Sequence, residues 1–430
     1  MIRLLLLLSL FFSLSASTPI RPIEVWIADD LDFLVEFYKE RHQTPEISLR
    51  EEKTAKVLAS ELRKVGFEVT ENFGGYGIVG ILKNGKGPTI LYRTDMDALP
   101  MPEKTGLEYA SKETVLLNGN EVGAMHSCGH DLHMTTWLGT ARALAANKRQ
   151  WKGTLLLIGQ PAEEIGAGAR MMLEAGLYEK FGVPDYGLGL HSSPTIKAGQ
   201  IGVADGYTMA NTEMIDIDVF GVGAHGASPH MSIDPVVISS MIIMELQTIV
   251  SRNVKPIDDA VVTVGAVQGG TVGNIIPDQV KLRLTVRTFK EEVRQLIHRR
   301  IKEVCNGTAM AAGLPKEKWP QVNIPEKFTP ANYNHPELTK RVVKSAEESL
   351  GKQNVVYAEP QLVGEDFAMY GSTEDKVPTV LFWLGTVSQE KIDNNDLPGL
   401  HSPFYYPEPR ESIETGVNVT SSILIDLFND

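Results

Sequence analysis

The sequence predicts an α/β domain into which a small ferredoxin-like α+β domain is inserted. Apolar strand patterns alternate with helical patterns before about residue 210 and again after about residue 329, which is typical of an α/β layered sheet. Between them, residues 211–328 show the order strand, helix, strand, strand, helix, strand of a ferredoxin-like unit. We therefore expect a main domain in two parts, 18–210 and 329–430, separated by an inserted domain, 211–328.

The first part of the main domain opens with helical patterns and continues with strands. A helix is expected after Ser48, which has the spacing of a capping box with Glu51. The stretch "GIVGILKNGKGPTILYRTDMDAL" contains two strands around Asn84-Gly85, a dipeptide typical of hairpin turns. A further helix is expected over about 131–147, and "GTLLLIGQP" is a continuous apolar run typical of a fully buried strand.

Strand and helix patterns also predict the elements of the inserted domain and of the last part of the main domain. "TEMIDIDVFG" alternates like a half-exposed strand, and "DPVVISSMIIMELQTIVSR" has helical spacing. "AVVTVGAVQGG" and "QVKLRLTVRTF" are expected to pair as strands before the helix "EEVRQLIHRRIKEVCNGTAMAAG" and the strand "QVNIPEK". The main domain then resumes with the helix "PELTKRVVKSAEESLG" and the strand "TVLFWLGT".

Size and charge limit the function. A chain of 430 residues that is 43% hydrophobic can build a sizeable core. Lys and Arg number 41 against 54 Asp and Glu, a net charge of −13. This balance argues against nucleic acid as a partner and is compatible with a small-molecule substrate.

The N-terminal stretch "MIRLLLLLSLFFSLSAS" has the pattern of a signal peptide. One arginine is followed by an apolar run and then by small residues, and the run is too short to span a bilayer. We expect residues 1–17 to be removed and the mature protein to be secreted or periplasmic, with no further segment of membrane-spanning length. The alternative is an uncleaved membrane anchor.

The segment "HSCGHDLH", residues 126–133, concentrates residue types that bind metals. It holds three of the chain's 10 histidines and one of its 2 cysteines. Cys128 and His130 stand two apart in a turn that leads into the expected helix, and thiolate and imidazole both bind zinc-like ions. Two other interpretations fit this segment alone: a Cys–His nucleophilic pair, and a polar turn with incidental histidines. A disulfide between Cys128 and Cys305 is a further alternative, disfavoured because the two lie in different expected domains.

Further metal-binding residue types follow expected strands. Glu163 and Glu164 come directly after a buried strand, so that one can bind a metal while the other holds the water on it. His191 follows an apolar run in "YGLGLHSSP", and His401 lies in the Gly/Pro-flanked loop "LPGLHSPFYYP". Each histidine alone would be explained as an ordinary loop residue, but together with Cys128 these residues indicate a metal centre.

The motifs "RTDMDALP", "HSCGHD", "GQPAEE", "GLH", "GAHGASPH", "GGTVGNIIPD", "TVRTF", "GEDF" and "LHSP" stand in the order seen in the M20 metallopeptidase/amidohydrolase family. The chain resembles this family over about residues 30–425, and in particular the subgroup of hippurate hydrolases, N-acyl-amino-acid amidohydrolases and auxin-conjugate hydrolases. The resemblance implies a three-layer α/β/α catalytic domain of the zinc-exopeptidase type, two divalent metal ions per subunit, and an inserted lid or dimerisation domain.

The resemblance also implies roles for individual residues. The implied metal ligands are Cys128, His130, Glu164, His191 and His401.

Glu163 matches the catalytic glutamate, which takes a proton from the attacking water and delivers it to the leaving amine. Asp97 matches an aspartate that supports a ligand histidine, whereas Asp95 falls where many relatives carry a ligand histidine.

The inserted domain carries further implied site residues. His225 resembles the histidine that stabilises the oxyanion, often within a partner subunit's site, which implies a homodimer through this domain. Asn274 and Arg287 resemble groups that grip the scissile carbonyl or the substrate carboxylate. His230 either shares one of these roles or only caps the following turn.

The expected function is hydrolysis of the amide bond of an N-acyl-L-amino acid or small peptide by a metal-activated water. One alternative is a dipeptidase or carboxypeptidase on the same scaffold. Another is a non-catalytic metal-binding homologue, which the intact Glu163 disfavours. Zinc fits the thiolate and imidazole ligands, and the carboxylate also admits manganese or cobalt.

Overall fold

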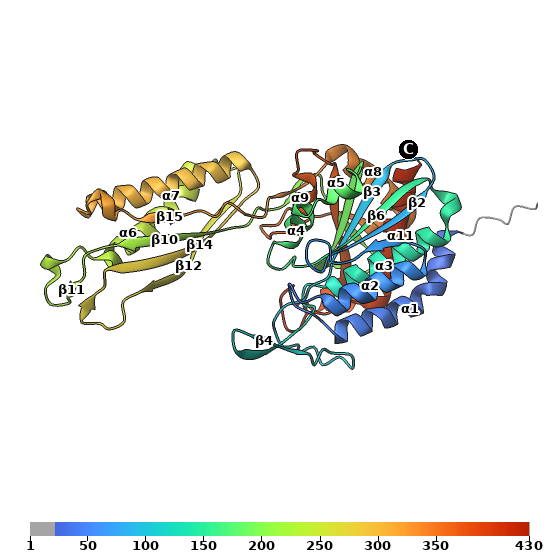
Figure 1. Ribbon diagram of the computed structural model, residues 1–430, viewed down its shortest axis with the longest axis horizontal. Coiled ribbons are helices and arrows are strands. Elements are labelled where there is room, and N and C mark those ends of the chain that lie inside the picture. The colour runs from blue at the N-terminus through green and yellow to red at the C-terminus, as the bar shows by residue number, and fades with distance from the viewer. Residues whose placement is uncertain (1–21, 430) are drawn as a thin grey trace, which may run out of the picture.

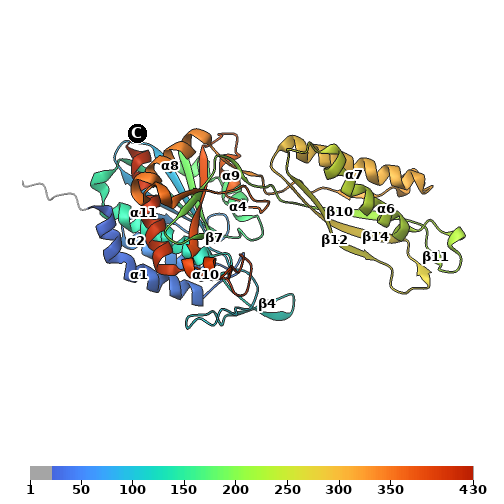
Figure 2. The same cartoon turned by 180° about the vertical axis from the view of Figure 1, so that it is seen from behind.

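The computed structural model describes residues 22–429 and contains two domains that lie end to end. The larger α/β domain contains both ends of the described chain, and the smaller domain projects from its opposite side (Figure 1; Figure 2 shows the reverse view). The predicted signal peptide, residues 1–17, lies outside the described residues.

A mixed sheet forms the centre of the larger domain. In the described part of the chain it has eight strands in the order β1-β2-β6-β3-β7-β18-β8-β17. The strands β6, β3, β7 and β18 run parallel to one another, while β2 is antiparallel to β6. Their bounds are β1 Glu68–Thr70, β2 Ile78–Asn84, β3 Thr89–Asp95, β6 Gly153–Gln160, β7 Tyr186–Lys197, β8 Ile201–Val203, β17 Val355–Tyr357 and β18 Thr379–Val387.

Helices cover both faces of this sheet. Successive residues of β6 alternate between two cores: Leu155 and Leu157 face one, whereas Leu156 and Ile158 face the other. The first core is covered by α1 Ile23–Gln43, α2 Glu52–Lys64, α3 His130–Ala146, α8 Pro336–Leu350 and α11 Pro409–Phe428. The second is covered by α4 Gly168–Glu174, α5 Leu177–Phe181 and α9 Ala368–Gly371. This arrangement confirms the predicted three-layer α/β/α domain.

The expected hairpin around Asn84-Gly85 was wrong. The turn itself forms, and Gly85 has a left-handed φ of 86°. However, β2 and β3 do not pair with each other, because both pair with β6, which lies between them. A segment that arrives about 70 residues later in the sequence therefore overrides the local turn signal.

The capping box at Ser48 and Glu51 was also wrong. Helix α2 begins at Glu52 without a side-chain cap. Ser48 donates instead to the Asp97 carboxylate at 2.6 Å, and Glu51 accepts from the backbone N–H of Ala162 at 2.8 Å. Both side chains are used by the loops of the candidate site rather than by the helix.

The smaller domain has the predicted ferredoxin-like order. Its sheet runs β12-β14-β10-β15 and is antiparallel throughout. Helices α6 and α7 pack on one face around a core that includes Ile217, Leu282 and Ile297. The other face is open, and Met214 on it is 61% exposed. The bounds are β10 Glu213–Phe220, α6 Pro235–Thr248, β12 Ala260–Gly269, β14 Gln279–Thr288, α7 Glu291–Ala311 and β15 Gln321–Asn323.

Short elements complete the molecule. Strands β4 Thr114–Leu117 and β5 Asn120–Gly123 form a hairpin that projects from the larger domain, as Figure 1 shows. Strands β9 Gly206–Met209 and β16 Asn332–Asn334 pair where the chain leaves and re-enters that domain. Strands β11 Ala224–His225 and β13 Ile275–Ile276 pair at the far end of the smaller domain, and α10 Gln389–Asp393 follows β18.

One helical stretch within residues 22–429, Pro235–Asn253, is apolar and long enough to cross a membrane by length and composition. The expectation that no further segment reaches this length was therefore wrong by length and composition. Ile238, Ile242 and Leu246 on this stretch pack into the core of the smaller domain. Met241 and Met244 on the same helix are 47% and 71% exposed.

Candidate metal centre

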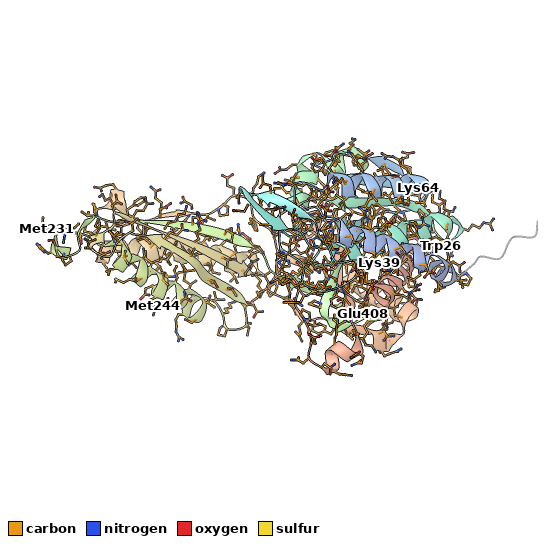
Figure 3. All side chains as sticks on the ribbon, turned by 90° about the horizontal axis from the view of Figure 1, so that it is seen from below. Trp26, Lys39, Lys64, Met231, Met244 and Glu408 are labelled. Carbon is orange, nitrogen blue, oxygen red and sulfur yellow. The ribbon has the colours of Figure 1, made fainter. Side chains whose placement is uncertain are left out.

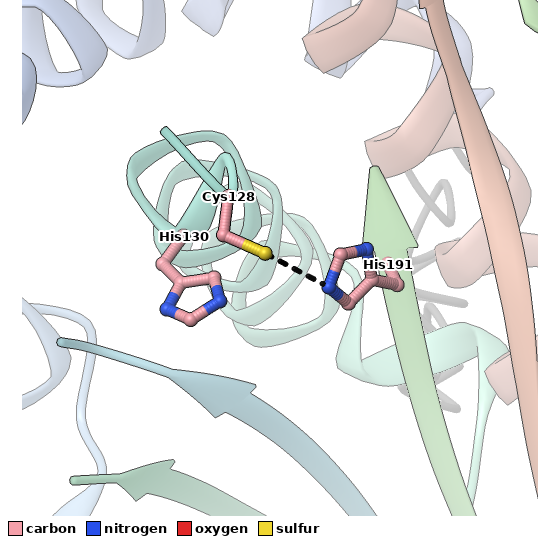
Figure 4. A group of neighbouring side chains, drawn as sticks. All are labelled: Cys128, His130 and His191. Atoms are coloured by element: carbon pink, nitrogen blue, oxygen red, sulfur yellow. Dashed lines mark hydrogen bonds between the residues drawn. The ribbon is translucent and has the colours of Figure 1, made fainter. Parts of the chain in front are cut away.

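The predicted metal ligands of the larger domain come together at one end of the main sheet. Cys128 and His130 lie in the turn that starts α3, and His191 lies on β7 (Figure 4). The Cys128 Sγ and His191 Nε2 atoms are 3.5 Å apart. His191 does not end its strand as expected, because β7 continues to Lys197.

The remaining two predicted ligands come from loops. Glu164 lies in the loop after β6, and its carboxylate is 3.3 Å from His401 Nε2. The backbone N–H of His401 donates to the carbonyl of Ser127 at 2.9 Å, which ties the His401 loop to the Cys128 turn. His401 has a left-handed φ of 63°, and its side chain is 56% exposed, so this side of the site is open.

These ligand atoms form overlapping groups that fit divalent ions. Within each of the groups Cys128–His130–His191 and Cys128–Glu164–His401, the ligand atoms lie within 4.8 Å of one another. The Nε2 atom of His130 and an Oε atom of Glu164 are buried with no hydrogen-bond partner, which is costly unless an ion satisfies them. The donor set and the unpartnered atoms therefore fit two metal positions that share Cys128.

The pKa of Cys128 bears on the choice between ligand and nucleophile. Burial, together with the nearby Glu164 carboxylate, raises the pKa of the Cys128 thiol well above its usual value. Burial also holds the pKa of His191 well below its usual value, so this neighbour is a neutral imidazole. A reactive thiolate is disfavoured in this setting without an added cation, which favours the ligand interpretation over a Cys–His nucleophilic pair. Both cysteines are free, so Cys128 and Cys305 form no disulfide.

Asp97 contacts three residues of the centre: Glu163, Glu164 and His130. Its carboxylate accepts hydrogen bonds from the backbone N–H groups of Glu163 at 3.1 Å and Glu164 at 3.0 Å. Its backbone carbonyl lies 2.7 Å from His130 Nδ1, which leaves Nε2 as the ligand atom. Burial opposes ionisation of Asp97, but hydrogen bonds from His130 and Ser48 lower the pKa of this carboxyl below its usual value.

Glu163 lies beside the ligands in a buried position. Its carboxylate is 3.9 Å from His130 Nε2, and the residue is 9% exposed. Burial and then the neighbouring Glu365 carboxylate raise the pKa of Glu163 well above its usual value. A buried carboxyl group next to a metal site is suited to exchange protons with a water molecule there.

Asp95, for which the resemblance implied no ligand role, is buried and paired within the protein. Asp95 lies 2.8 Å from His133 Nδ1 and 2.8 Å from the Arg93 guanidinium. His133 in turn accepts from the backbone N–H of Ser192 at 2.7 Å. Asp95 and His133 therefore hold the strand ends around the ligands in place.

A second acidic pair, for which no role was predicted, lies beside Glu163. Glu365 and Asp366, in the loop before α9, form a group with Glu163 in which the carboxylate oxygens lie within 4.8 Å of one another. The Arg93 guanidinium bonds Glu365 at 2.9 Å and Asp366 at 3.1 Å. Both residues belong to the motif "GEDF", which could have indicated this acidic pair.

A buried histidine for which no role was predicted lies next to the α3 turn. His42 of α1 lies 2.6 Å from Asp131 and 3.1 Å from Glu103. Burial opposes the charged ring, but the hydrogen bonds to these two carboxylates outweigh it and raise the pKa of His42 to about 9. The charged His42 anchors the residue directly after His130.

The predicted substrate residues of the inserted domain separate into two places. His225, His230 and Asn274 are exposed at the distal tip (residues 223–231 and 271–276), at the end of the molecule away from the larger domain (Figure 1). There, the Gly226 N–H donates to the Asn274 carbonyl at 2.8 Å, so His225 and Asn274 lie close together. Arg287 lies instead at the junction of the domains, hydrogen-bonded to Thr212.

Comparison with known proteins places the chain in a family. Residues 91–426 match the model of peptidase family M20/M25/M40. The chain is 37% identical to an N-acetylcysteine deacetylase from Bacillus subtilis, over 83% of this chain and 89% of the relative. It is 38% identical to a hippurate hydrolase from Campylobacter jejuni, over 80% and 87%. It is also 34% identical to an N-acetyldiaminopimelate deacetylase from Lactobacillus acidophilus, over 91% and 97%.

Solved structures agree with this assignment. A protein from methicillin-resistant Staphylococcus aureus superposes with a TM-score of 0.84 and 31% identity, over 94% of this chain and 99% of that chain. The Bacillus subtilis YXEP protein, a dinuclear metal binding peptidase of the M20 family, superposes with a TM-score of 0.75 and 29% identity, over the same shares. With its motifs, its metal-binding clusters and these relatives, the chain belongs to peptidase family M20/M25/M40 and is a hydrolase that acts on amide bonds.

Proposed function

We propose that the protein hydrolyses the amide bond of N-acyl-L-amino acids that carry a free α-carboxylate. The observation that carries this proposal is the buried Glu163 beside the cluster of Cys128, His130, His191 and Glu164. The relatives' names support the substrate class, because they specify N-acetylated amino acids and hippurate as the compounds cleaved.

The ligand set proposed for two divalent ions is Cys128, His130, Glu164, His191 and His401, with Cys128 common to both groups. Bound divalent ions would polarise the scissile carbonyl and activate a water molecule at neutral pH. Zinc, manganese and cobalt all suit these donors. Reconstitution of chelated protein with each ion, followed by activity and metal analysis, identifies the ion that supports turnover.

Glu163 is proposed as the general base and then the general acid. It removes a proton from the attacking water and later delivers that proton to the leaving amine. Asp97 holds the backbone of Glu163 and Glu164 in place, because its carboxylate accepts hydrogen bonds from the N–H groups of both residues. This hydrogen bonding holds the backbone of Glu163 and Glu164 so that both carboxylates lie beside His130.

Arg287 is proposed to bind the substrate carboxylate. It lies at the junction between the domains, and its guanidinium is 3.5 Å from the position that a Cβ on Gly364 would occupy, one residue before Glu365. A half-buried guanidinium near the metal centre suits recognition of a carboxylate.

A second copy of this chain is proposed to complete the site. His225 accepts the Ala227 N–H on Nδ1 at 3.0 Å, so the neutral ring carries its proton on Nε2 and can donate to an oxyanion. In one chain this donor lies at the distal tip, away from the metal centre. Exposed apolar side chains on the inserted domain, Met231 at 69% and Met244 at 71%, would be covered in a homodimer (Figure 3).

A hydrolysis screen with metal-reconstituted protein tests the proposal. N-acetyl and N-benzoyl L-amino acids should be cleaved, and their amides without a free carboxylate should be poor substrates because Arg287 loses its partner. Dipeptides with a free α-amino group form the second panel. Preference for that panel would replace the proposal with a dipeptidase, and cleavage of neither panel would contradict it.

Export is proposed on the N-terminal pattern alone. Residues 1–17 are proposed as a cleaved signal, which makes the mature enzyme secreted or periplasmic and free of a membrane segment. Cell fractionation with N-terminal sequencing of the mature protein tests this, and an intact N-terminus in the membrane fraction would indicate an anchor instead.

A further inference from the structure

Two chain segments connect the domains, and they pair with each other. The outgoing linker (residues 210–212) leads into β10, and the return linker (residues 327–329) leads back from the inserted domain. The Thr212 N–H donates to the Thr329 carbonyl at 2.9 Å, and the Thr329 N–H donates to the Thr212 carbonyl at 3.3 Å. The two linkers are therefore bonded to each other at the base of the inserted domain.

The outgoing linker packs on the segment that precedes Glu365. The Ala210 N–H donates to the Gln361 carbonyl at 3.1 Å. Three residues later, Gly364 lies so close to Thr212 that a Cβ on Gly364 would overlap Thr212 Oγ1. Rotation of the Thr212 side chain about χ1 would not relieve this overlap without cost. It would move the Oγ1 atom away from Arg287 and break their hydrogen bond, and Thr is branched at Cβ, so the methyl group also restricts the rotation.

The return linker packs on the segment that follows Glu164. A Cβ on Gly166 would lie 2.6 Å from Thr329 Oγ1. The Arg170 guanidinium donates to the Phe328 carbonyl at 2.5 Å, and Lys327 pairs with Glu174 at 2.8 Å. From the other side, Arg294 of α7 stacks on the Phe328 ring at 3.7 Å, which ties this linker to the inserted domain.

The two segments touched by the linkers are the two acidic loops of the metal centre. One carries Glu163 and Glu164, and the other carries Glu365 and Asp366. The cysteine and histidines of the α3 turn and β7 come from elements built into the main domain. A displacement of the linkers would thus move the carboxylates relative to the Cys and His ligands.

We propose that Thr212 and Thr329 are positioning residues that couple the orientation of the inserted domain to the placement of Glu163, Glu164 and Glu365. This inference rests on the proposed function for its kinetic consequence, but its structural part concerns metal binding alone. Gly166 and Gly364 have no side chain, so the linker threonines pack directly against the backbone of the two acidic loops. Because protein interiors are closely packed, a displacement of these threonines would be passed on to the loops.

A double-mutant cycle at Thr212 and Gly364 tests the coupling. Gly364→Ala should lower kcat roughly 10- to 100-fold, since a displacement near 1 Å has that effect on a catalytic group. It should also weaken metal affinity, measured by equilibrium dialysis without substrate. Thr212→Ala alone should have a smaller effect, and the double variant should recover to within about threefold of Thr212→Ala, because the new methyl group fills the space of the lost hydroxyl.

The control is Gly307→Ala, a glycine in α7 whose added Cβ meets no atom within 4 Å. It should leave kcat and metal affinity unchanged. A double variant whose losses equal the product of the two single losses would overturn the coupling. Loss of Arg287 contact alone would raise KM without changing metal affinity, so the dialysis separates the two effects.

The second linker supplies an independent test should Gly364→Ala fail to fold. Thr329→Ala removes the atoms packed on Gly166, whereas Thr329→Val keeps their shape. Metal affinity and kcat should fall in Thr329→Ala and stay near wild type in Thr329→Val, and equal behaviour of both with wild type would overturn the inference. Wild-type protein that hydrolyses none of the tested amides would contradict the proposed function, while the metal affinities would still decide the coupling.

Discussion

The metal centre and the distal tip both contain residues with proposed catalytic roles, yet the two regions are built in opposite ways. At the centre, Asp97 and Asp95 are fully buried and bonded to protein donors. At the tip, His225 and Asn274 are exposed and held by a two-residue strand pair. The centre is therefore preorganised within one chain, whereas the proposed role of the tip depends on a second surface.

The largest expected effect tests the division of roles at the centre. Glu163→Gln keeps the size and hydrogen bonding of the side chain but cannot exchange a proton, so kcat should fall roughly 10²–10⁴-fold with metal content near wild type. Glu164→Gln should instead lose metal first and regain activity in excess metal. Kinetics and metal analysis of both purified variants check this, and equal metal loss in both would contradict the assignment.

A second variant probes the shared ligand. Cys128→Ser should weaken metal binding by roughly 10²-fold, because loss of even an outer hydrogen-bond partner of a ligand costs 10- to 100-fold and a serine hydroxyl stays protonated at neutral pH. Cys305→Ser is the matched control, since Cys305 lies buried in the core of the inserted domain. Full metal content with lost turnover in Cys128→Ser would mean that the thiol is a nucleophile.

Subunit mixing tests whether the tip acts in a partner's site. Glu163→Gln and His225→Ala should each be inactive alone, but a mixed dimer pairs one intact Glu163 with one intact His225 in the same site. Co-expression followed by purification through two different tags isolates the mixed dimer, which should have about one half of wild-type activity because one of its two sites is intact. Recovery near zero, with dimers present by light scattering, would indicate that His225 does not serve the partner's site.

The smallest effect concerns stability and pH. The folded-state pKa of His42, raised from 6.5 to about 9, lies above the unfolded value. The stabilising contribution is therefore complete below about pH 6.5 and is lost as the pH rises through about 9, a change of up to roughly 3 kcal/mol. The melting temperature should fall by a few degrees over this range, and His42→Gln should flatten that slope; an unchanged slope would contradict the raised pKa.

The parts of the structure that could be predicted are those with a repeating or contiguous signal. The continuous apolar run of β6 predicted a buried strand, and the order of six elements predicted the inserted domain. Strand neighbours were harder, because β6 enters between β2 and β3 from a distant part of the chain. Turn chemistry at Asn84-Gly85 describes the local backbone and carries no information about that neighbour.

The same distinction holds at the site. The structure brings together Cys128, Glu164, His191 and His401, which the motifs singled out. No role was predicted for Arg93 and Glu365, because their ion pair joins residues that are 272 positions apart in the sequence. Glu51 was misinterpreted as a helix cap because its true partner, the Ala162 N–H, lies 111 residues away.

The position of the chain ends has a practical consequence. Helices α1 and α11 pack together on the side of the larger domain away from the inserted domain, and the described chain begins and ends there (Figure 2). An affinity tag or carrier attached beyond α11 would therefore hold the enzyme on the side of the larger domain that faces away from the inserted domain. Immobilised in this way, the molecule would present the open metal centre and the distal tip outward, so a surface-bound catalyst could still receive substrate and a second subunit from solution.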